Sequence, residues 1–483
     1  MFKTLQKEWG KDKDLPDRAF RLSTLTKVID GTIYDCLKHD FFEESADNGE
    51  YIPIRARRPS VRYRLCRLVV DDTASLLFSE GHFPSPECDD EAAKENLELL
   101  LATLPLNDVL VDAVTRGSVG SVAILLHVLD NRAFLTVMQT AYLTPTWKPT
   151  APDTLLKVTE RYKVRGQTLI DAGYAVEKEN SLYWWQRDWT ETDETFYIPL
   201  EVSPDADKQT PKRDATRSTT HNLGFVPMVW IRNLPGGDTT DGACTFPDEA
   251  IDTNIELDYQ LSQAGRGLKY SSDPTLLIKE PAVGENGKMI KGAGNAIVVS
   301  ADGDAKMLEI NGTAVEAVIN YVRLLRELAL ESMHGNRANV EKSMSAPSGK
   351  ALEMLNQSLI WLTDKLRVSY GENGLKTLIA MVIAAHAKIP LKTKTGKTIP
   401  EISVDTQVSL RWPPWYAPTL TDMGERADTL VKLTDGGLLS RETAIKVLSA
   451  EYDIEDSKAE KLLADADMAQ RNAEAQKQVK ITE

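Results

Sequence analysis

The chain has 483 residues, of which 42% are hydrophobic, and it carries 72 acidic against 57 basic residues, a net charge of −15. This length exceeds what one hydrophobic core usually serves, so we expect two or more subdomains. The acidic balance excludes a general nucleic-acid coat, because nonspecific affinity for DNA comes from neutralising phosphates with Lys and Arg. Any contact with DNA must therefore be local.

Cysteine and histidine usage predicts no metal or cofactor site. The four cysteines form no CxxC pair, and the six histidines form no HExxH or Cys/His cluster. We expect reduced thiols in a cytosolic setting. The N-terminus lacks the apolar core of a signal peptide, and the apolar run at 378–387 is shorter than the roughly 20 residues that cross a bilayer. No membrane or secretion role is predicted.

The first half of the chain mixes helical and strand-like segments. Helical spacing covers 16–38 and 60–78, and Pro59 and Ser60 indicate the start of the second helix. After residue 119, short runs such as SVAILLHVL and YWWQRDW are rich in β-branched and aromatic residues, which predicts a meander of antiparallel strands. A polar stretch at 203–222 predicts a mobile surface loop. We therefore expect a mixed α and β region over 1–246.

Two helices separated by a small β-rich insertion are predicted next. The first covers 247–270, with acidic residues near its positive end, and the second covers 313–334, where Thr313 and Glu316 have the spacing of a capping box. Between them, PTLLIKE and NAIVVS predict strands joined by Gly-rich turns, including ADGD. The second helix has an apolar stripe and a separate polar stripe, which comprises Glu316, Asn320, Arg323, Glu327 and Glu331.

A non-helical break at 335–347 then separates two helical patterns. It carries Arg337 and Lys342, with Lys350 just beyond. From 348 to 388, leucines recur at steps of three and four, as in a coiled-coil seam, and Gly371 and Gly374 predict a kink. A strand-like segment and a rigid linker cover 389–416, and short helices with a polar tail cover 417–483.

No catalytic signature stands out. The run TKTGKTIP resembles the end of a phosphate-binding P-loop, but position 391 is Leu instead of the first glycine, and Pro400 disfavours the helix that should follow. We therefore predict a hairpin turn. Asp71 and Asp72 could serve as paired carboxylates for metal or acid–base chemistry, although their helical setting favours a solvated face.

The order of these elements resembles the portal proteins of tailed double-stranded DNA bacteriophages, which form the head-to-tail connector ring. The segments that carry the resemblance are VRYRLCRLVVDDTASLLFSE (61–80), FPDEAIDTNIELDYQLSQ (246–263), MSAPSGKALEML (344–355), and Trp412 with the segment 417–448. The resemblance implies an α+β portal-type fold. Its implied parts are a mixed α/β wing (1–246), stem helices (247–270 and 313–334), a clip (271–312), a tunnel loop (335–347), a long kinked helix (348–388), a wing strand and linker (389–416), and a helical crown with a polar tail (417–483).

The resemblance also implies a function without catalysis or cofactor. Twelve subunits would form a ring at one capsid vertex, through which DNA is packaged and later ejected. The implied partners are further copies of this chain, double-stranded DNA in the channel, the terminase large subunit, the major capsid protein, the scaffolding protein, and a head–tail connector or adaptor. The implied location is the virion, and the host cytoplasm during assembly.

Three sets of residues are expected to serve this function. The resemblance places Arg337, Lys342 and Lys350 on the DNA-facing tunnel loop, and the clip residues Lys279, Lys288 and Lys291 where terminase and connector dock. The polar stripe from Glu316 to Glu331 is expected to face the channel or a neighbouring stem helix. An acidic wall would let DNA slide, because it offers few phosphate contacts.

Other interpretations stay open at this point. The cations near 337–350 are also consistent with ordinary solvated charges. The chain could instead be a metal- or nucleotide-dependent nucleic-acid enzyme that uses Asp71 and Asp72 or the GKT turn. It could also be a non-portal oligomeric virion scaffold held together by the leucine seam.

Replacing Arg337→Glu together with Lys342→Glu should leave ring assembly intact and impair DNA packaging or retention, because the substitutions reverse the charge facing the phosphates. The length and yield of packaged DNA measure the effect. Unchanged packaging in assembled particles would refute a DNA-facing role for this loop.

Overall fold

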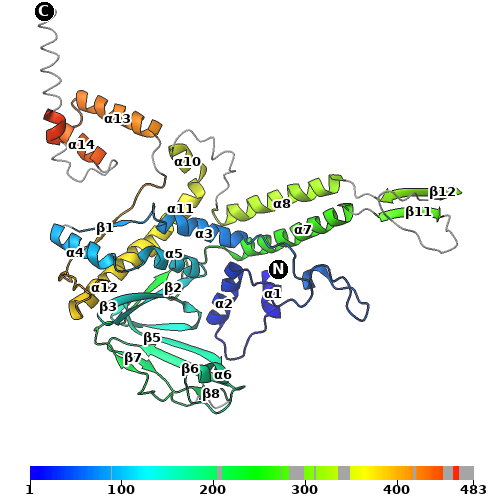
Figure 1. Cartoon of the computed structure of the whole chain (residues 1–483), viewed down its shortest axis with the longest axis horizontal. Helices are drawn as coiled ribbons and strands as arrows, with labels where there is room; N and C mark the ends of the chain where they lie inside the picture. The colour runs from blue at the N-terminus through cyan, green and yellow to red at the C-terminus, as the bar shows by residue number, and fades with distance from the viewer. Residues whose placement is uncertain are drawn as a thin grey trace, which may run out of the picture. The chain divides into compact units, whose positions relative to one another are not determined.

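The computed structural model describes residues 1–88, 90–203, 209–272, 275–281, 299–308, 312–335, 349–416, 420–449 and 461–466. The chain divides into two compact units, of which the first is Met1–Arg337 with Asn356–Pro413 and the second is Ala338–Leu355 with Pro414–Glu483. The fold is mixed α and β (Figure 1). Among the described residues, no helix combines the length and the apolar composition that crossing a bilayer requires.

Helices at the start of the first unit supply much of its core. They are α1 (Phe2–Glu8), α2 (Asp17–Asp30), α3 (Leu65–Phe78), α4 (Glu91–Leu101) and α5 (Leu106–Gly117). Helix α3 is the most deeply buried, since Leu65, Val69, Val70, Leu77 and Phe78 have no exposed surface. The predicted helix over 16–38 is shorter than expected, because Gly31 ends α2 in a left-handed conformation (φ 75°) that glycine adopts without strain.

Two antiparallel sheets follow. The strands are β2 (Ser121–Leu129), β3 (Arg132–Gln139), β4 (Leu143–Lys148), β5 (Ala151–Arg165), β6 (Leu182–Trp189), β7 (Asp193–Phe196), β8 (Leu200–Glu201), β9 (Thr219–Thr220) and β10 (Met228–Arg232), with α6 (Gly166–Asp171) between β5 and β6. One sheet has the order β10-β2-β3, and the other has the order β4-β5-β6-β7-β9 with β8 paired to β6. The predicted meander is present in β4–β7, whereas β2 and β3 belong to the separate sheet.

Strand β2 is buried on both faces. Val122, Ile124 and Leu126 belong to the main core of the first unit. Ala123 and Leu125 point to the opposite side and join a second apolar cluster that includes Trp189. A strand covered on both faces needs a continuous apolar run rather than an alternating one, which explains the sequence SVAILL.

The polar segment predicted as a mobile loop is structured over residues 209–222. Tyr197 pairs with Arg213, and β9 pairs with β7. Arg217 donates hydrogen bonds to the carbonyls of Ala172 and Gly173, and its guanidinium lies 3.8 Å from the ring of Tyr174. Local sequence gave no signal for this strap, because its strand pairing is short and its partners are polar. Residues 204–208 lie outside the described residues.

A helical hairpin with a two-stranded end follows in sequence. Helices α7 (Asp248–Ser272) and α8 (Gly312–Ser332) lie side by side, and β11 (Thr275–Pro281) pairs with β12 (Val299–Leu308) beyond them (Figure 1). The hairpin was predicted, with two errors. Helix α8 begins at Gly312, so Thr313 is not its cap. ADGD at 301–304 lies within β12, where Asp304 pairs with Lys279 of β11 and the register shifts just before it.

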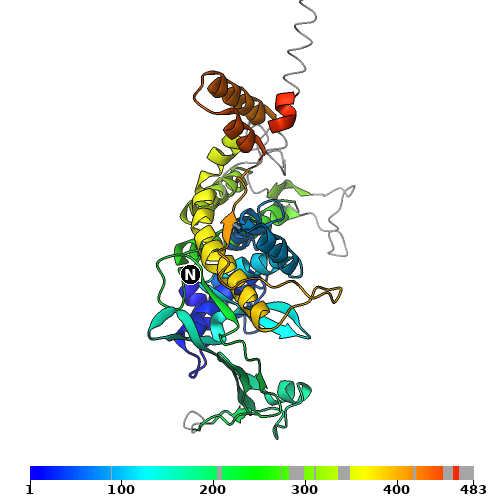
Figure 2. The same cartoon turned by 90° about the vertical axis from the view of Figure 1, so that its left-hand side faces the viewer.

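A long helical run crosses the first unit. It consists of α11 (Gln357–Leu366), a π-helical segment (Arg367–Leu375) and α12 (Lys376–Lys388), drawn in yellow in Figure 2. The two glycines predicted to cause a kink both lie in the π-helical segment. Gly371 lies against Trp412 and Gly374 against Ile231, so a side chain at either position would collide with its neighbour. The seam residues Leu362 and Leu366 are buried in this unit's own core.

The remaining elements are short. β1 (Ser85–Glu87) pairs with β13 (Ser409–Arg411), which is the strand formed within the segment 389–416 predicted as strand and linker. The second unit contains α10 (Gly349–Leu355), α13 (Leu420–Asp435), α14 (Arg441–Ser449) and a helical segment over 461–466. That segment is tied to α14 by ion pairs of 2.8 Å from Arg441 to Asp465 and from Lys461 to Glu442.

Gly371→Ala should destabilise the protein by about 1–3 kcal/mol, because the new methyl group collides with the packed Trp412 ring. Gly265→Ala is the matched control: Gly265 lies in α7 with open space around its Cα, so alanine should stabilise the helix by about 1 kcal/mol. Thermal unfolding at one protein concentration compares the two. Equal shifts for both variants would contradict the assignment of close packing at Gly371.

Candidate functional site

The α7–α8 hairpin is anchored to the core by a row of polar side chains on α7. The carboxamide of Asn254, the carboxylate of Asp258 and the hydroxyl of Ser262 recur every four residues and accept hydrogen bonds from three backbone N–H groups. The donors are Leu65 (2.7 Å), Tyr63 (2.7 Å) and Val61 (3.0 Å), which alternate along an extended segment. Four helical residues advance about 6 Å. Two extended residues advance about 6.6 Å, a similar rise, so donors two residues apart can meet acceptors four residues apart on a helix. The left-handed Arg64 joins Tyr63 to Leu65, the first residue of α3.

This ladder explains why α3 starts later than predicted. The sequence predicted a helix from residue 60, but α3 begins at Leu65. The backbone N–H groups of 61, 63 and 65 are bound by α7, and Arg64 has a left-handed backbone conformation with φ 53°. Tertiary hydrogen bonds therefore override the local helical pattern in this segment.

Asp258 is a buried carboxylate at the centre of the ladder, with 1% of its surface exposed. Besides the Tyr63 N–H, it accepts hydrogen bonds from the Tyr34 hydroxyl (2.8 Å) and the Asn254 amide (3.2 Å). Burial raises the pKa of Asp258 to about 6, although the hydrogen bonds from Tyr63 and Tyr34 oppose the shift. Burial, and then the Asp258 charge, raise the pKa of the Tyr34 hydroxyl.

A compact loop over residues 39–57 braces α7 from another side. It is built around Arg57, which is fully buried and donates to the carbonyls of Ile52 and Phe41. The Tyr259 hydroxyl of α7 donates to the Arg57 carbonyl at 2.8 Å. An ion pair joins Arg55 to Glu256. The first half of α7 is thereby held on several sides.

Helix α8 presents the predicted polar stripe to the outside. Leu325, Ala329 and Met333 are buried on one side of the helix. All five predicted residues, Glu316, Asn320, Arg323, Glu327 and Glu331, are exposed. Their spacing puts them on the side opposite the buried residues.

An apolar row lies next to the polar stripe. Tyr321, Leu324 and Leu328 are spaced by three and four residues and keep 43%, 50% and 50% of their surface exposed. A contiguous row of large apolar side chains on a helix is unusual on a free surface. Helix α8 thus has a core face, an acidic outward face and an apolar flank.

The other predicted site residues are not brought together by the described part of the chain. Arg337, Lys342, Lys288 and Lys291 lie outside the described residues. Lys350 lies in α10, in the second unit. Lys279 is exposed on β11, with Asp304 opposite it in the register.

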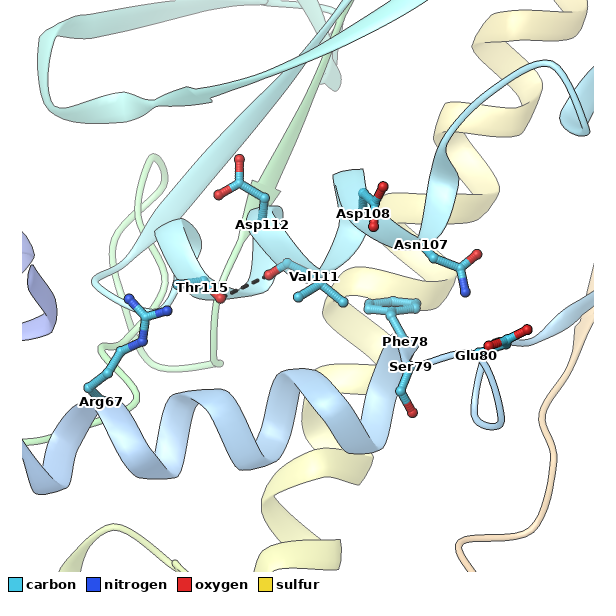
Figure 3. Close-up of a pocket in the computed structure, with 9 residues that line it drawn as sticks. All are labelled: Arg67, Phe78, Ser79, Glu80, Asn107, Asp108, Val111, Asp112 and Thr115. Carbon is cyan, nitrogen blue, oxygen red and sulfur yellow. Dashed lines mark hydrogen bonds between the residues drawn. The ribbon is translucent and has the colours of Figure 1, made fainter.

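A surface groove of about 700 Å³ lies between α3 and α5 (Figure 3). Its described lining is Arg67, Phe78, Ser79, Glu80, Asn107, Asp108, Val111, Asp112 and Thr115. Arg67 forms an ion pair with Asp71 at 2.7 Å, and the Thr115 hydroxyl donates to the Val111 carbonyl at 2.9 Å. Among these lining residues there is no His, Cys or Lys to act as a base or nucleophile next to the carboxylates.

The structure shows the surroundings of the two motifs considered for an enzyme, the Asp71–Asp72 pair and the GKT turn. Asp71 pairs with Arg67, and burial followed by the Asp71 charge raises the pKa of Asp72. Residues 392–398 form a hairpin, as the bridge between Lys392 and Thr398 shows. Within the described residues, no group of three or more His, Cys, Asp or Glu side chains is placed to hold a metal ion.

Comparison with known families identifies the chain. Residues 66–472 match the family model described as phage portal protein, SPP1 Gp6-like. The chain belongs to this phage portal protein family. The match begins in α3 and includes the α7–α8 hairpin and the long helical run, so the predicted resemblance is confirmed.

Solved structures that the chain matches include a virion of a native gene transfer agent (GTA) particle, with 11% identity, TM-score 0.38, and coverage of 80% of this chain and 89% of the other. The neck of a native GTA particle computed with C12 symmetry has 11% identity, TM-score 0.39, and coverage of 80% and 88%. Identity and TM-score are low, so the assignment rests on the family match. A comparison with curated proteins finds no relative.

Sequence reasoning missed the residues that hold the portal hairpin in place. The spacing of Asn254, Asp258 and Ser262 is visible in the sequence, but polar residues every four positions are also typical of a solvated helix face. Their partners at 61–65 lie 189 to 201 residues away in sequence. The local sequence pattern therefore could not distinguish buried polar residues that hold α7 in place from a solvent-exposed face of the helix.

Asp258→Asn should change the pH dependence of stability. The folded pKa of Asp258, about 6, exceeds the value near 4 of an unfolded aspartate. Its stabilising contribution is therefore fully present below about pH 4 and is lost as pH rises through about 6. From pH 7 to pH 5, the wild type should gain about 1 kcal/mol of unfolding free energy relative to the variant. Denaturant titration at both pH values measures this gain, and a pH-independent difference would contradict it.

Proposed function

We propose that this portal-family chain forms a ring of about twelve copies at one capsid vertex and acts as a passive conduit for double-stranded DNA. DNA enters through the channel when the terminase packages it and leaves through the same channel on ejection. The family match supports this function. The structural observation that carries the proposal is the acidic stripe of α8, exposed opposite the helix face that is buried.

The stripe suits a channel wall that must not hold DNA. Each copy contributes three carboxylates, Glu316, Glu327 and Glu331, against one guanidinium, Arg323, a net charge of −2 at neutral pH. Ring symmetry repeats these charges as circles around the axis. Phosphates are repelled by such circles, and few counterions are released on contact, so the duplex slides with weak grip.

The apolar flank of α8 suits the contact between neighbouring copies. Tyr321, Leu324 and Leu328 are exposed beside the acidic stripe. If the stripe faces the channel, a flank turned by roughly a quarter of the helix circumference faces the next subunit. Burying these side chains would contribute about 1.5–3 kcal/mol for each one fully covered. The proposal therefore assigns the acidic stripe to the channel and the apolar flank to the neighbouring subunit.

The remaining parts are assigned by family likeness as parts of this proposal. Helices α7 and α8 form the stem, and β11–β12 form the clip, where Lys279 lies among the residues that meet the terminase large subunit and later the connector or adaptor. The segment with Arg337, Lys342 and Lys350 narrows the channel around DNA. The two large sheets and their helices form the wing, which contacts the major capsid protein and scaffolding protein, and the second unit contributes the crown.

No described feature favours catalysis over this function. The α3–α5 groove combines carboxylates with an arginine that is already paired. The GKT sequence lies in a hairpin rather than at the start of a helix, where a phosphate would be cradled by backbone N–H groups. We therefore propose no enzymatic role.

Glu316→Lys with Glu327→Lys should convert the α8 stripe from a surface that repels DNA phosphates into one that binds them. Each copy changes by four charge units, so assembled rings should retain a linear duplex more tightly, with a steeper dependence on salt as lysines contact phosphates. Binding of a linear duplex of about 100 base pairs to assembled rings, titrated with salt, measures the effect.

The matched control is Glu177→Lys with Glu179→Lys, which makes the same charge change at two exposed positions after α6. The control should leave the salt dependence close to that of the wild type. If both pairs tightened binding equally, the effect would come from net charge alone, and the α8 stripe would not face the channel.

A further inference from the structure

A hairpin after α12 concentrates positive charge on this acidic chain. Residues 388–400, KIPLKTKTGKTIP, contain four lysines and no acidic residue. Lys388, Lys392, Lys394 and Lys397 are all exposed. Within the described part of the chain, none of the four side chains forms an ion pair. We call residues 388–400 the lysine hairpin; it follows α12 and lies beside β3 (Figure 1).

The lysine hairpin is a rigid projection. Its base is buried through Leu391 and Ile399, which are 1% and 3% exposed. His386 joins both arms: its Nδ1 accepts a hydrogen bond from the Leu391 N–H at 3.0 Å, and its Nε2 donates to the Pro400 carbonyl at 2.9 Å. A loop fixed in this way loses little conformational entropy when it binds a partner.

The hairpin is also tied to the β2–β3 turn and closed by a tight turn of its own. The Lys392 N–H donates to the Asn131 carbonyl at 2.7 Å, and the Asn131 side chain donates to the Pro390 carbonyl at 3.0 Å. At the tip, Gly396 has φ 85°, which favours glycine. The neighbouring turn adds Asp130 and Arg132, whose charges offset one another.

The register places cations on both faces of the hairpin. Lys392 lies opposite Thr398, and successive residues of an extended arm point to opposite faces. Lys397, next to Thr398, therefore lies on the face opposite Lys392, while Lys394 is two residues beyond Lys392 at the tip. A narrow two-stranded ribbon fits the major groove of a duplex, which is about 12 Å wide and is bordered by phosphates on both sides.

We propose that the lysine hairpin binds the phosphate backbone of double-stranded DNA outside the channel, without sequence specificity. This inference rests on the proposed function, which brings a duplex to the protein. A cluster of lysines suits phosphate contacts better than a protein interface, because protein interfaces are depleted in Lys and centre on Trp, Tyr and Arg. The exposed apolar side chains near the β2–β3 turn are Leu129 and Phe134, and the Arg132 guanidinium lies over the Phe134 ring at 5.2 Å.

Closed circular DNA tests the proposal, because a covalently closed duplex cannot thread a preformed ring. Assembled wild-type rings should bind a relaxed closed circle with salt-dependent affinity. The variant Lys392→Gln, Lys394→Gln, Lys397→Gln should bind about tenfold or more weakly at low salt, and the salt slope should fall by about 0.9 for each lysine that contacts a phosphate. The fold should persist, because none of the three side chains is buried.

The matched control removes three exposed lysines elsewhere: Lys3→Gln, Lys7→Gln and Lys13→Gln near the N-terminus. It should retain wild-type binding of the circle. Equal weakening by both triple variants, or binding unaffected by the hairpin variant, would overturn the proposal. The proposal would also be overturned if the hairpin variant bound the circle normally but no longer bound the particle's shell protein. The partner of the hairpin would then be a protein and not DNA.

The native mass of each sample separates this inference from the proposed function. If the rings assemble and the circle binds regardless of the hairpin, only the hairpin proposal fails. If the wild type forms no ring, the conduit fails, whereas hairpin-dependent DNA binding by the smaller species would still support the hairpin as a DNA contact.

Discussion

The arrangement of the first unit depends on the pairing between the polar row of α7 and the extended segment 61–65. Asn254, Asp258 and Ser262 accept hydrogen bonds from the backbone N–H groups of Leu65, Tyr63 and Val61, at and before the start of α3. The pairing joins the α7–α8 hairpin to α3, the most buried helix of the core, and through Tyr34 to the segment after α2. Together with the loop over residues 39–57, it fixes the base of the hairpin whose helix α8 carries the acidic stripe. Fixing the hairpin in this way requires the Asp258 carboxylate to be buried, which raises its pKa.

Charge is distributed according to what each surface must do. The chain as a whole carries −15, and the outward stripe of α8 is acidic, which suits a wall past which DNA moves. Positive charge is concentrated instead on a rigid hairpin anchored to β2–β3. A conduit needs weak contact along its channel, whereas a surface that binds the genome needs several phosphate contacts at one place. In the proposed function, separating the two kinds of charge would let one acidic chain provide both.

Much of the fold was predictable from sequence because it is encoded locally. The continuous apolar run of β2, the aromatic strand β6, and the two helices of the hairpin all follow from residue pattern, and Gly371 and Gly374 mark the π-helical segment. The failures have a common cause. Residues 60–64 have a helical pattern but are held out of the helix by hydrogen bonds to α7, and the strap over 209–222 pairs with β7 without a strand signal of its own. The sequence predicted the five stripe residues on one face of a helix, and all five are exposed on α8, whereas their anchor was missed because its partners are distant in sequence.

The central claim, that this portal-family chain assembles into a DNA conduit, is tested most directly by the native mass of the purified wild-type protein across a range of concentrations. The account predicts a closed ring of about twelve copies, because the apolar flank of α8 requires a neighbour and a ring lets every copy cover the next. Electron microscopy of the same sample should show a central channel. A monomer or dimer at all concentrations would contradict the account.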